Sequence, residues 1–98
     1  MSFIDTYNFE NLTNEAEKLV FKELERQLAM CEEVICRCNE CVVDMAAMSL
    51  NTVKPLYRFS LLGTLYAATA MDDESYATSV REAVSDAIEK VRQNPAHD

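Results

Sequence analysis

The sequence predicts a mainly α-helical protein with three principal helices and one short β-hairpin, folded as a single domain over residues 1–98. Three observations support this prediction. The 98 residues include one glycine and two prolines, so residues that form turns are scarce. The 49% hydrophobic and 27% charged residues are typical of a folded chain rather than a disordered one. Apolar residues also recur with helical spacing over two long segments, and a third segment between them is apolar almost all round.

The first helix is expected over residues 14–31, after an irregular arm over residues 1–13. Asn14 is a suitable N-cap, and Glu17 stands three positions later, as in a capping box. The apolar residues that recur every four positions are Ala16, Val20, Leu24 and Leu28. They form one face that can pack against a core, while charged residues occupy the opposite side.

The second helix is expected over residues 40–51, with Asn39 as its N-cap. The stretch 42–50 is apolar almost all round. A helix of this kind is buried on several sides, either in the centre of the domain or at the interface of a homodimer. Asn51 and Pro55 end it, because proline cannot continue a helix.

Residues 57–68 change from the period of a helix to that of a strand. The alternating side chains are Tyr57, Phe59 and Leu61 before Gly63, and Thr64, Tyr66 and Ala68 after it. This pattern predicts a β-hairpin over 57–68 with Gly63 in its turn. Because an isolated two-stranded hairpin is marginally stable, we expect it to pack on helices or to pair with another chain.

The third helix is expected over residues 72–93. Either Asp72 or Asp73 can cap its start, since both stand directly before the segment with helical spacing. Apolar residues then recur at helical spacing up to its last turn. Asn94 and Pro95 end it.

Four cysteines lie within eleven residues, and no other position of the chain is a cysteine: Cys31, Cys36, Cys38 and Cys41. Thiolates converging from so short a stretch suit a tetrahedral soft cation, with zinc as the first choice. We therefore expect a zinc-clamped corner over residues 31–41, joining the first and second helices. All four positions would be filled by protein, so the site would be structural and would leave no position for a catalytic water.

Two alternatives to this zinc site remain, free thiols and disulfide or redox chemistry. A disulfide between Cys36 and Cys38 would be strained by their short separation. The fourth ligand is the weakest part of the prediction, because Cys31 stands apart from the other three and lies near the apolar face of the first helix. His97, the only histidine, could take its place if the C-terminal tail folds back.

The formal charge of −8 disfavours binding to DNA or to anionic membranes, because an acidic surface repels phosphates. The segment 34–71 is the exception, with two acids against three bases and thus a net charge of +1. The first residues lack the basic start and apolar run of a signal peptide, and no apolar stretch is long enough to span a bilayer. We expect a cytoplasmic protein, in which thiols stay reduced.

One block of the sequence resembles the late competence development protein ComFB family. The block is Cys36-Arg-Cys38-Asn-Glu-Cys41, followed by Asp44, Ala46-Ala47, Leu50-Asn51 and Pro55-x-Tyr57, and the chain closes with Val91-x-x-Asn94-Pro95-x-His97. The resemblance implies a small, mainly helical, zinc-binding homodimer whose motif cysteines are Cys36, Cys38 and Cys41. Some cyanobacterial members resemble receptors for cyclic dinucleotides.

Two functions follow as hypotheses. The first is a regulatory protein that binds a cyclic dinucleotide, with Lys54 and Arg58 pairing with phosphates and Tyr57 stacking on a base. The alternative is that these residues bind no ligand and are ordinary surface and core residues. The second is a protein–protein interaction module with an unknown protein partner and no small-molecule ligand. An enzyme is not expected, because Gly63 is the only glycine and the sole histidine lies in the tail.

Overall fold

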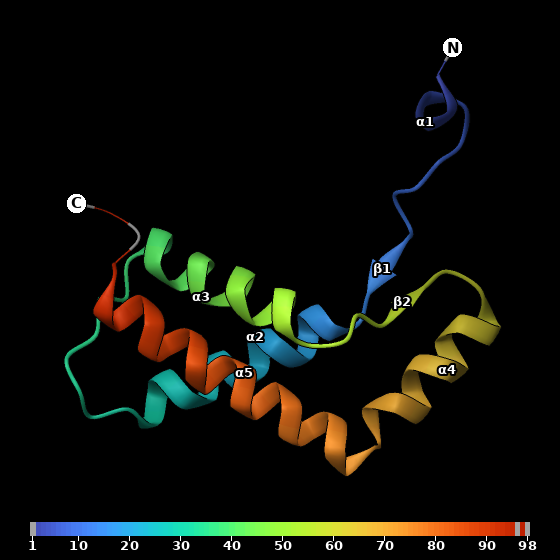
Figure 1. Ribbon diagram of the computed structural model, residues 1–98. Helices are drawn as coiled ribbons and strands as arrows, with labels where there is room; N and C mark the ends of the chain where they lie inside the picture. The colour runs from blue at the N-terminus through green and yellow to red at the C-terminus, as the bar shows by residue number, and fades with distance from the viewer. Residues whose placement is uncertain (1, 96, 98) are drawn as a thin grey trace.

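The structure, a computed structural model, describes residues 2–95 and residue 97, and it is mainly helical (Figure 1). The elements in chain order are α1 (Phe3–Thr6), β1 (Thr13–Asn14), α2 (Ala16–Met30), α3 (Asn39–Thr52), β2 (Tyr57–Arg58), α4 (Leu61–Met71) and α5 (Glu74–Gln93). The mainly helical fold is confirmed, and three of its helices lie within a few residues of the predicted ranges. In Figure 1, α2, α3 and α5 pack together, while α4 and the N-terminal arm extend away from them.

The core lies between α2, α3 and α5, because each presents one apolar face to the other two. The buried residues of α2 are the four predicted from their spacing, Ala16, Val20, Leu24 and Leu28. The longest helix, α5, buries a stripe that runs from Tyr76 to Val91. From α3, Cys41, Met45 and Ser49 are buried, and the Ser49 hydroxyl donates to the Met45 carbonyl at 2.8 Å. The buried polar group of Ser49 therefore has a partner.

The helix starts differ from the predictions by one residue in two cases. Cys38, not Asn39, is the N-cap of α3, and its sulfur accepts from the Cys41 amide. For α2 the N-cap position is Glu15, which makes no side-chain capping bond, while the predicted cap Asn14 accepts from the Ala16 amide at 3.1 Å. Asp73 caps α5 as expected, by accepting from the Ser75 amide.

The predicted hairpin over 57–68 is wrong. The two-stranded antiparallel pair is formed instead by β1 and β2, with Thr13 opposite Arg58 and Asn14 opposite Tyr57. Residues after Ser60 form the helix α4, whose start is capped because the Ser60 hydroxyl accepts from the Gly63 amide. Gly63 has no positive φ and makes no turn. Only Tyr57 and Arg58 of the predicted hairpin form a strand, and the strand paired with them is β1, which lies before α2 in the chain.

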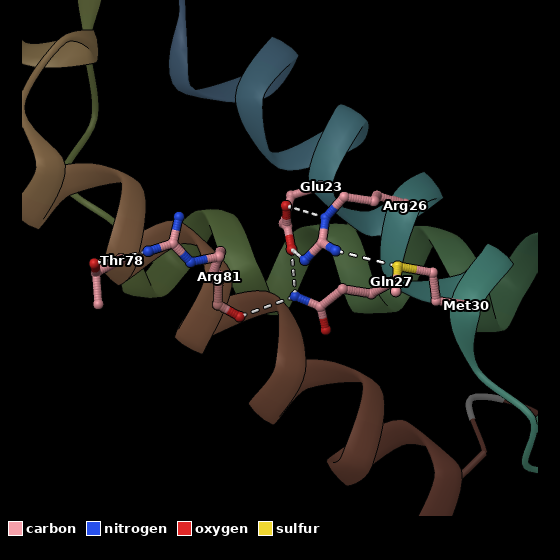
Figure 2. Close-up of polar contacts among 6 residues, drawn as sticks. All are labelled: Glu23, Arg26, Gln27, Met30, Thr78 and Arg81. Carbon is pink, nitrogen blue, oxygen red and sulfur yellow. Dashed lines mark hydrogen bonds and ion pairs between the residues drawn. The ribbon is translucent and has the colours of Figure 1, made fainter.

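A polar seam joins α2 to α5 on the surface of the bundle (Figure 2). The Gln27 side-chain amide donates to the Arg81 carbonyl of α5 at 3.1 Å and to the Glu23 carboxylate at 2.7 Å. Arg26 also donates to Glu23, and this hydrogen bond is the main reason why the pKa of Glu23 lies below its usual value. Among the described residues, no helix combines the length and the apolar character needed to cross a membrane.

Candidate metal centre

Three cysteines and one histidine come together where the start of α3 meets the end of α5. The residues are Cys36, Cys38, Cys41 and His97, and their potential ligand atoms all lie within 4.8 Å of one another. Cys36 lies in the connection between α2 and α3, Cys38 caps α3, and Cys41 lies in the first turn of α3. His97 comes from the tail that follows α5, which ends beside the start of α3 (Figure 1).

Two sulfurs of this cluster, those of Cys36 and Cys38, have hydrogen-bonding partners within it. The Cys41 amide donates to the Cys38 sulfur at 3.4 Å, so a backbone N–H at the positive end of α3 faces a sulfur. The Cys36 sulfur lies 3.1 Å from Nε2 of His97. This contact with His97 is the main reason why the pKa of Cys36 is lowered to about 6, with smaller contributions from the Cys38 backbone amide and from the Cys38 and Cys41 side chains.

The donor set fits zinc. With a Zn–S distance of about 2.3 Å and a Zn–N distance of about 2.0 Å, tetrahedral angles place neighbouring sulfurs about 3.8 Å apart and sulfur and nitrogen about 3.5 Å apart. The 3.1 Å contact between Cys36 and His97 is about 0.4 Å shorter than the sulfur–nitrogen separation, and the 4.8 Å upper limit exceeds the sulfur–sulfur separation by about 1 Å. Three cysteines and one histidine are also a common donor set for structural zinc. Small side-chain adjustments would suffice to hold the ion.

Cys31, which we expected as the fourth ligand, is not part of this cluster among the described residues. It follows the last residue of α2 and is half-buried against the core. The Arg37 guanidinium donates to the Leu28 carbonyl at 2.7 Å and to the Cys31 carbonyl at 3.5 Å, so it binds the end of α2. His97 is the histidine that the sequence offered as an alternative, and the structure brings it to the other three cysteines.

The three residues expected to bind a ligand, Lys54, Tyr57 and Arg58, lie along one segment before α4. Tyr57 is exposed, as a stacking residue would be. Arg58, however, is engaged in an ion pair with Glu15, whose side chain is 9% exposed. The hydrogen bond from Arg58 is the main reason why the pKa of Glu15 lies below its usual value. The structure thus gives Arg58 a partner within the chain.

The sequence supported His97 only weakly as a metal ligand. A lone histidine in a tail is more often solvated than bound to a metal. The sequence offered it only as the sole histidine of the chain, able to join the cysteines if the C-terminal tail folds back. Its place in the cluster depends on the packing of α5 against α3, which spacing alone does not show.

The fold and the cluster define a small helical protein with a candidate metal centre of three cysteines and one histidine. Comparison with known proteins identifies the family to which the chain belongs. The family model described as Late competence development protein ComFB matches residues 13–95, and the chain belongs to this family. No curated protein matches the sequence.

Among solved structures, the chain is similar to the late competence protein ComFB from Bacillus subtilis. The two share 25% sequence identity with a TM-score of 0.65, and the match covers 86% of this chain and 93% of that one. The resemblance noted from the sequence is therefore confirmed over nearly the whole chain. The match to the family model begins at Thr13, so the arm before β1 lies outside it.

Proposed function

We propose that this protein is a cytoplasmic, zinc-binding, homodimeric regulatory protein without catalytic activity. The observation that carries the proposal is the convergence of Cys36, Cys38, Cys41 and His97 within 4.8 Å of one another. With four protein ligands the ion would have no open position for water or substrate, so its role would be structural. Membership of the ComFB family supports this proposal.

In this proposal the metal holds the C-terminal tail against the corner before α3. Bound zinc supplies positive charge that stabilises the three thiolates. The chain contributes the geometry, since Cys38 and Cys41 are fixed by the first turn of α3. An ion pair of 3.4 Å between Glu33 and Arg92 holds the same connection to the end of α5. Metal binding would therefore stabilise the junction of α2, α3 and α5.

The regulatory role leaves two candidates for what the protein senses or binds. The first is a cyclic dinucleotide bound near Lys54, Tyr57 and Arg58, supported by the exposed rings of Tyr57 and Phe59 on either side of Arg58. The second is a protein partner with no small-molecule ligand. The ion pair of Arg58 with Glu15 favours the second candidate, because a phosphate would have to compete with a carboxylate already in place.

Metal analysis of protein purified without chelator tests the zinc site. We expect about one zinc per chain in the unmodified protein, and a loss of zinc in Cys36→Ser and Cys38→Ser. Cys31→Ser is the matched control, because Cys31 lies outside the cluster, and it should retain its zinc. Absence of metal from the unmodified protein, or loss of zinc on replacing Cys31 alone, would contradict the proposed site.

Calorimetric titration with a panel of cyclic dinucleotides separates the two candidate roles. Binding that is weakened by Tyr57→Ala and by Lys54→Ala would support the receptor. A protein that retains its zinc and is silent across the panel would remove the receptor hypothesis and leave the interaction module.

A further inference from the structure

The three cysteines of the candidate metal centre differ in their access to solvent. Cys36 is exposed, Cys38 is half-buried and Cys41 is buried. His97, whose Nε2 lies 3.1 Å from the Cys36 sulfur, is also exposed. A surface depression of about 400 Å³ opens beside them, and its lining residues are Cys38, Asn39, Glu40 and His97. Because a water-sized molecule occupies about 30 Å³, a small oxidant can reach the outer side of the cluster.

The same three residues differ in how firmly the backbone holds them. Cys38 caps α3, and its sulfur accepts from the Cys41 amide, so the first turn of α3 fixes both residues. Cys36 lies in the connection between α2 and α3, outside any helix or strand. The exposed cysteine of the cluster is therefore also the one that can shift most readily.

The geometry favours Cys41 as the partner of Cys36 in a disulfide. The ligand atoms of the cluster lie within 4.8 Å of one another, whereas the two sulfurs of a disulfide are about 2.0 Å apart. A movement of Cys36 by less than about 3 Å therefore closes the gap to Cys41. Cys38 is a poorer partner for Cys36, because a disulfide between residues separated by one position is strained.

We propose that Cys36 is a peroxide-sensitive thiol, and that its oxidation to a disulfide with Cys41 releases both the metal and the C-terminal tail. This inference rests on the zinc centre of the proposed function and adds a way to open it. In a cytoplasmic protein, disulfides that form are usually transient and redox-sensing rather than structural.

The reaction balances with one molecule of hydrogen peroxide as the oxidant. The Cys36 thiolate attacks a peroxide oxygen, so an S–O bond forms, the O–O bond breaks and hydroxide leaves. The Cys41 thiolate then attacks the Cys36 sulfur, so the S–S bond forms, the S–O bond breaks and a second hydroxide leaves. The two thiolates lose two electrons in total, and the peroxide gains the same two.

Consumption of two sulfur donors opens the junction between the tail and the start of α3. Cys38 and His97 are then the remaining ligands of the cluster, and two ligands hold zinc much more weakly than the four of a structural site. The ion pair between Glu33 and Arg92 also spans this junction, but the two side chains are 67% and 36% exposed. Exposed pairs contribute little, so the tail is no longer fixed to α3.

Peroxide titration of the zinc-loaded protein tests the proposal. We expect about one zinc released per hydrogen peroxide consumed, measured with a colorimetric chelator, and rebinding of zinc after a thiol reductant is added. Trypsin cleaves after Arg37, so Cys36 and Cys41 fall on different peptides, which mass spectrometry should find joined. In a parallel sample, dimedone, which traps sulfenic acids, should label Cys36 first.

Cys31→Ser is the matched control. Cys31 lies outside the cluster, so this variant should release its zinc with the same peroxide stoichiometry. It also removes the other cysteine from the tryptic peptide that contains Cys36, so the disulfide can be assigned without ambiguity. Hydrogen exchange in the first turn of α3 should become faster on oxidation and slow again on reduction.

Four results would overturn the proposal: zinc that stays bound while peroxide is consumed, a disulfide from Cys36 to Cys38, first oxidation at Cys31, or unchanged hydrogen exchange after zinc release. A protein that holds no zinc when purified without chelator would refute the metal centre itself and with it the release step. The disulfide map distinguishes the two failures, because it reports on the pairing of Cys36 with Cys41 whether or not metal is bound.

Discussion

The side-chain oxygen of Asn14 accepts a hydrogen bond of 2.7 Å from the backbone amide of Leu56. The same oxygen accepts from the Ala16 amide at 3.1 Å, and the Glu15 amide donates to the Leu56 carbonyl at 2.8 Å. The start of α2 is thereby tied to the segment before β2, although the two lie 42 positions apart in the chain. The side chain of Leu56 is buried at this junction.

Replacing Asn14 should therefore cost stability through its acceptor oxygen. Asn14→Ala leaves the Leu56 amide without its partner, and we expect a loss of about 1–3 kcal/mol in the free energy of unfolding. Asn14→Asp keeps an acceptor in the same place and should lose much less. Chemical denaturation of the two variants measures the difference. Equal losses in both would show that the oxygen is not the important group.

Removing the charge of Glu15 should break its ion pair with Arg58. We expect Glu15→Gln to destabilise the fold by about 1–3 kcal/mol, less than for a fully buried pair because Arg58 is partly exposed. Glu17→Gln is the matched control, since Glu17 is an exposed acid one half-turn away, and it should change stability by less than about 0.5 kcal/mol. Thermal unfolding at about pH 7 compares the two variants.

The same pair gives stability a defined pH dependence. The folded-state pKa of Glu15 is lowered from 4.5, so the stabilisation is complete above that value and is lost as the pH falls through the lower folded-state pKa. The difference in unfolding free energy between unmodified protein and Glu15→Gln should thus be largest near pH 7 and shrink toward about pH 3. A constant difference across this range would assign the effect of the substitution to packing instead.

His97 should control the ionisation of Cys36 in metal-free protein. The contact with His97 is the largest cause of the lowered pKa of about 6, so His97→Ala should raise the pKa of Cys36. The ultraviolet absorbance of the thiolate, taken as the difference from Cys36→Ser, follows this titration. Cys31→Ser should leave it unchanged. A pKa of Cys36 that is insensitive to His97→Ala would place the tail away from the cluster in the absence of metal.

Replacing Met45 by alanine should destabilise the fold more than replacing Met30 by alanine. Its side chain is fully buried between the helices, so Met45→Ala should leave a cavity and lower stability by about 2–5 kcal/mol. Met30 lies exposed at the end of α2, and Met30→Ala should change stability by less than about 0.5 kcal/mol. Urea unfolding of both variants gives the comparison, and similar losses would argue against the packing of α3 described above.

The parts of the fold that local patterns could predict were those with a strong helical period. Ala16, Val20, Leu24 and Leu28 recur every four residues and are all buried, so α2 was predictable. The 57–68 segment was not, because the alternation of its side chains is typical of strands, whereas Ser60 caps a helix that begins at Leu61. Its real partner is β1, which contributes two residues from a distant part of the chain and carries no strand pattern of its own.

By itself, the sequence determined that the protein is helical. It also determined that Cys36, Cys38 and Cys41 form one cluster, because residues so close along the chain must lie close in space. Only the tertiary structure decided the fourth member. Cys31 is nearer along the chain, but the end of α2 directs it toward the core and α5. His97 is 56 positions beyond Cys41, and the packing of α5 on α3 brings the tail back to the start of α3. Proximity in sequence brings the three cysteines together, and the packing of α5 on α3 adds the distant His97 to the cluster.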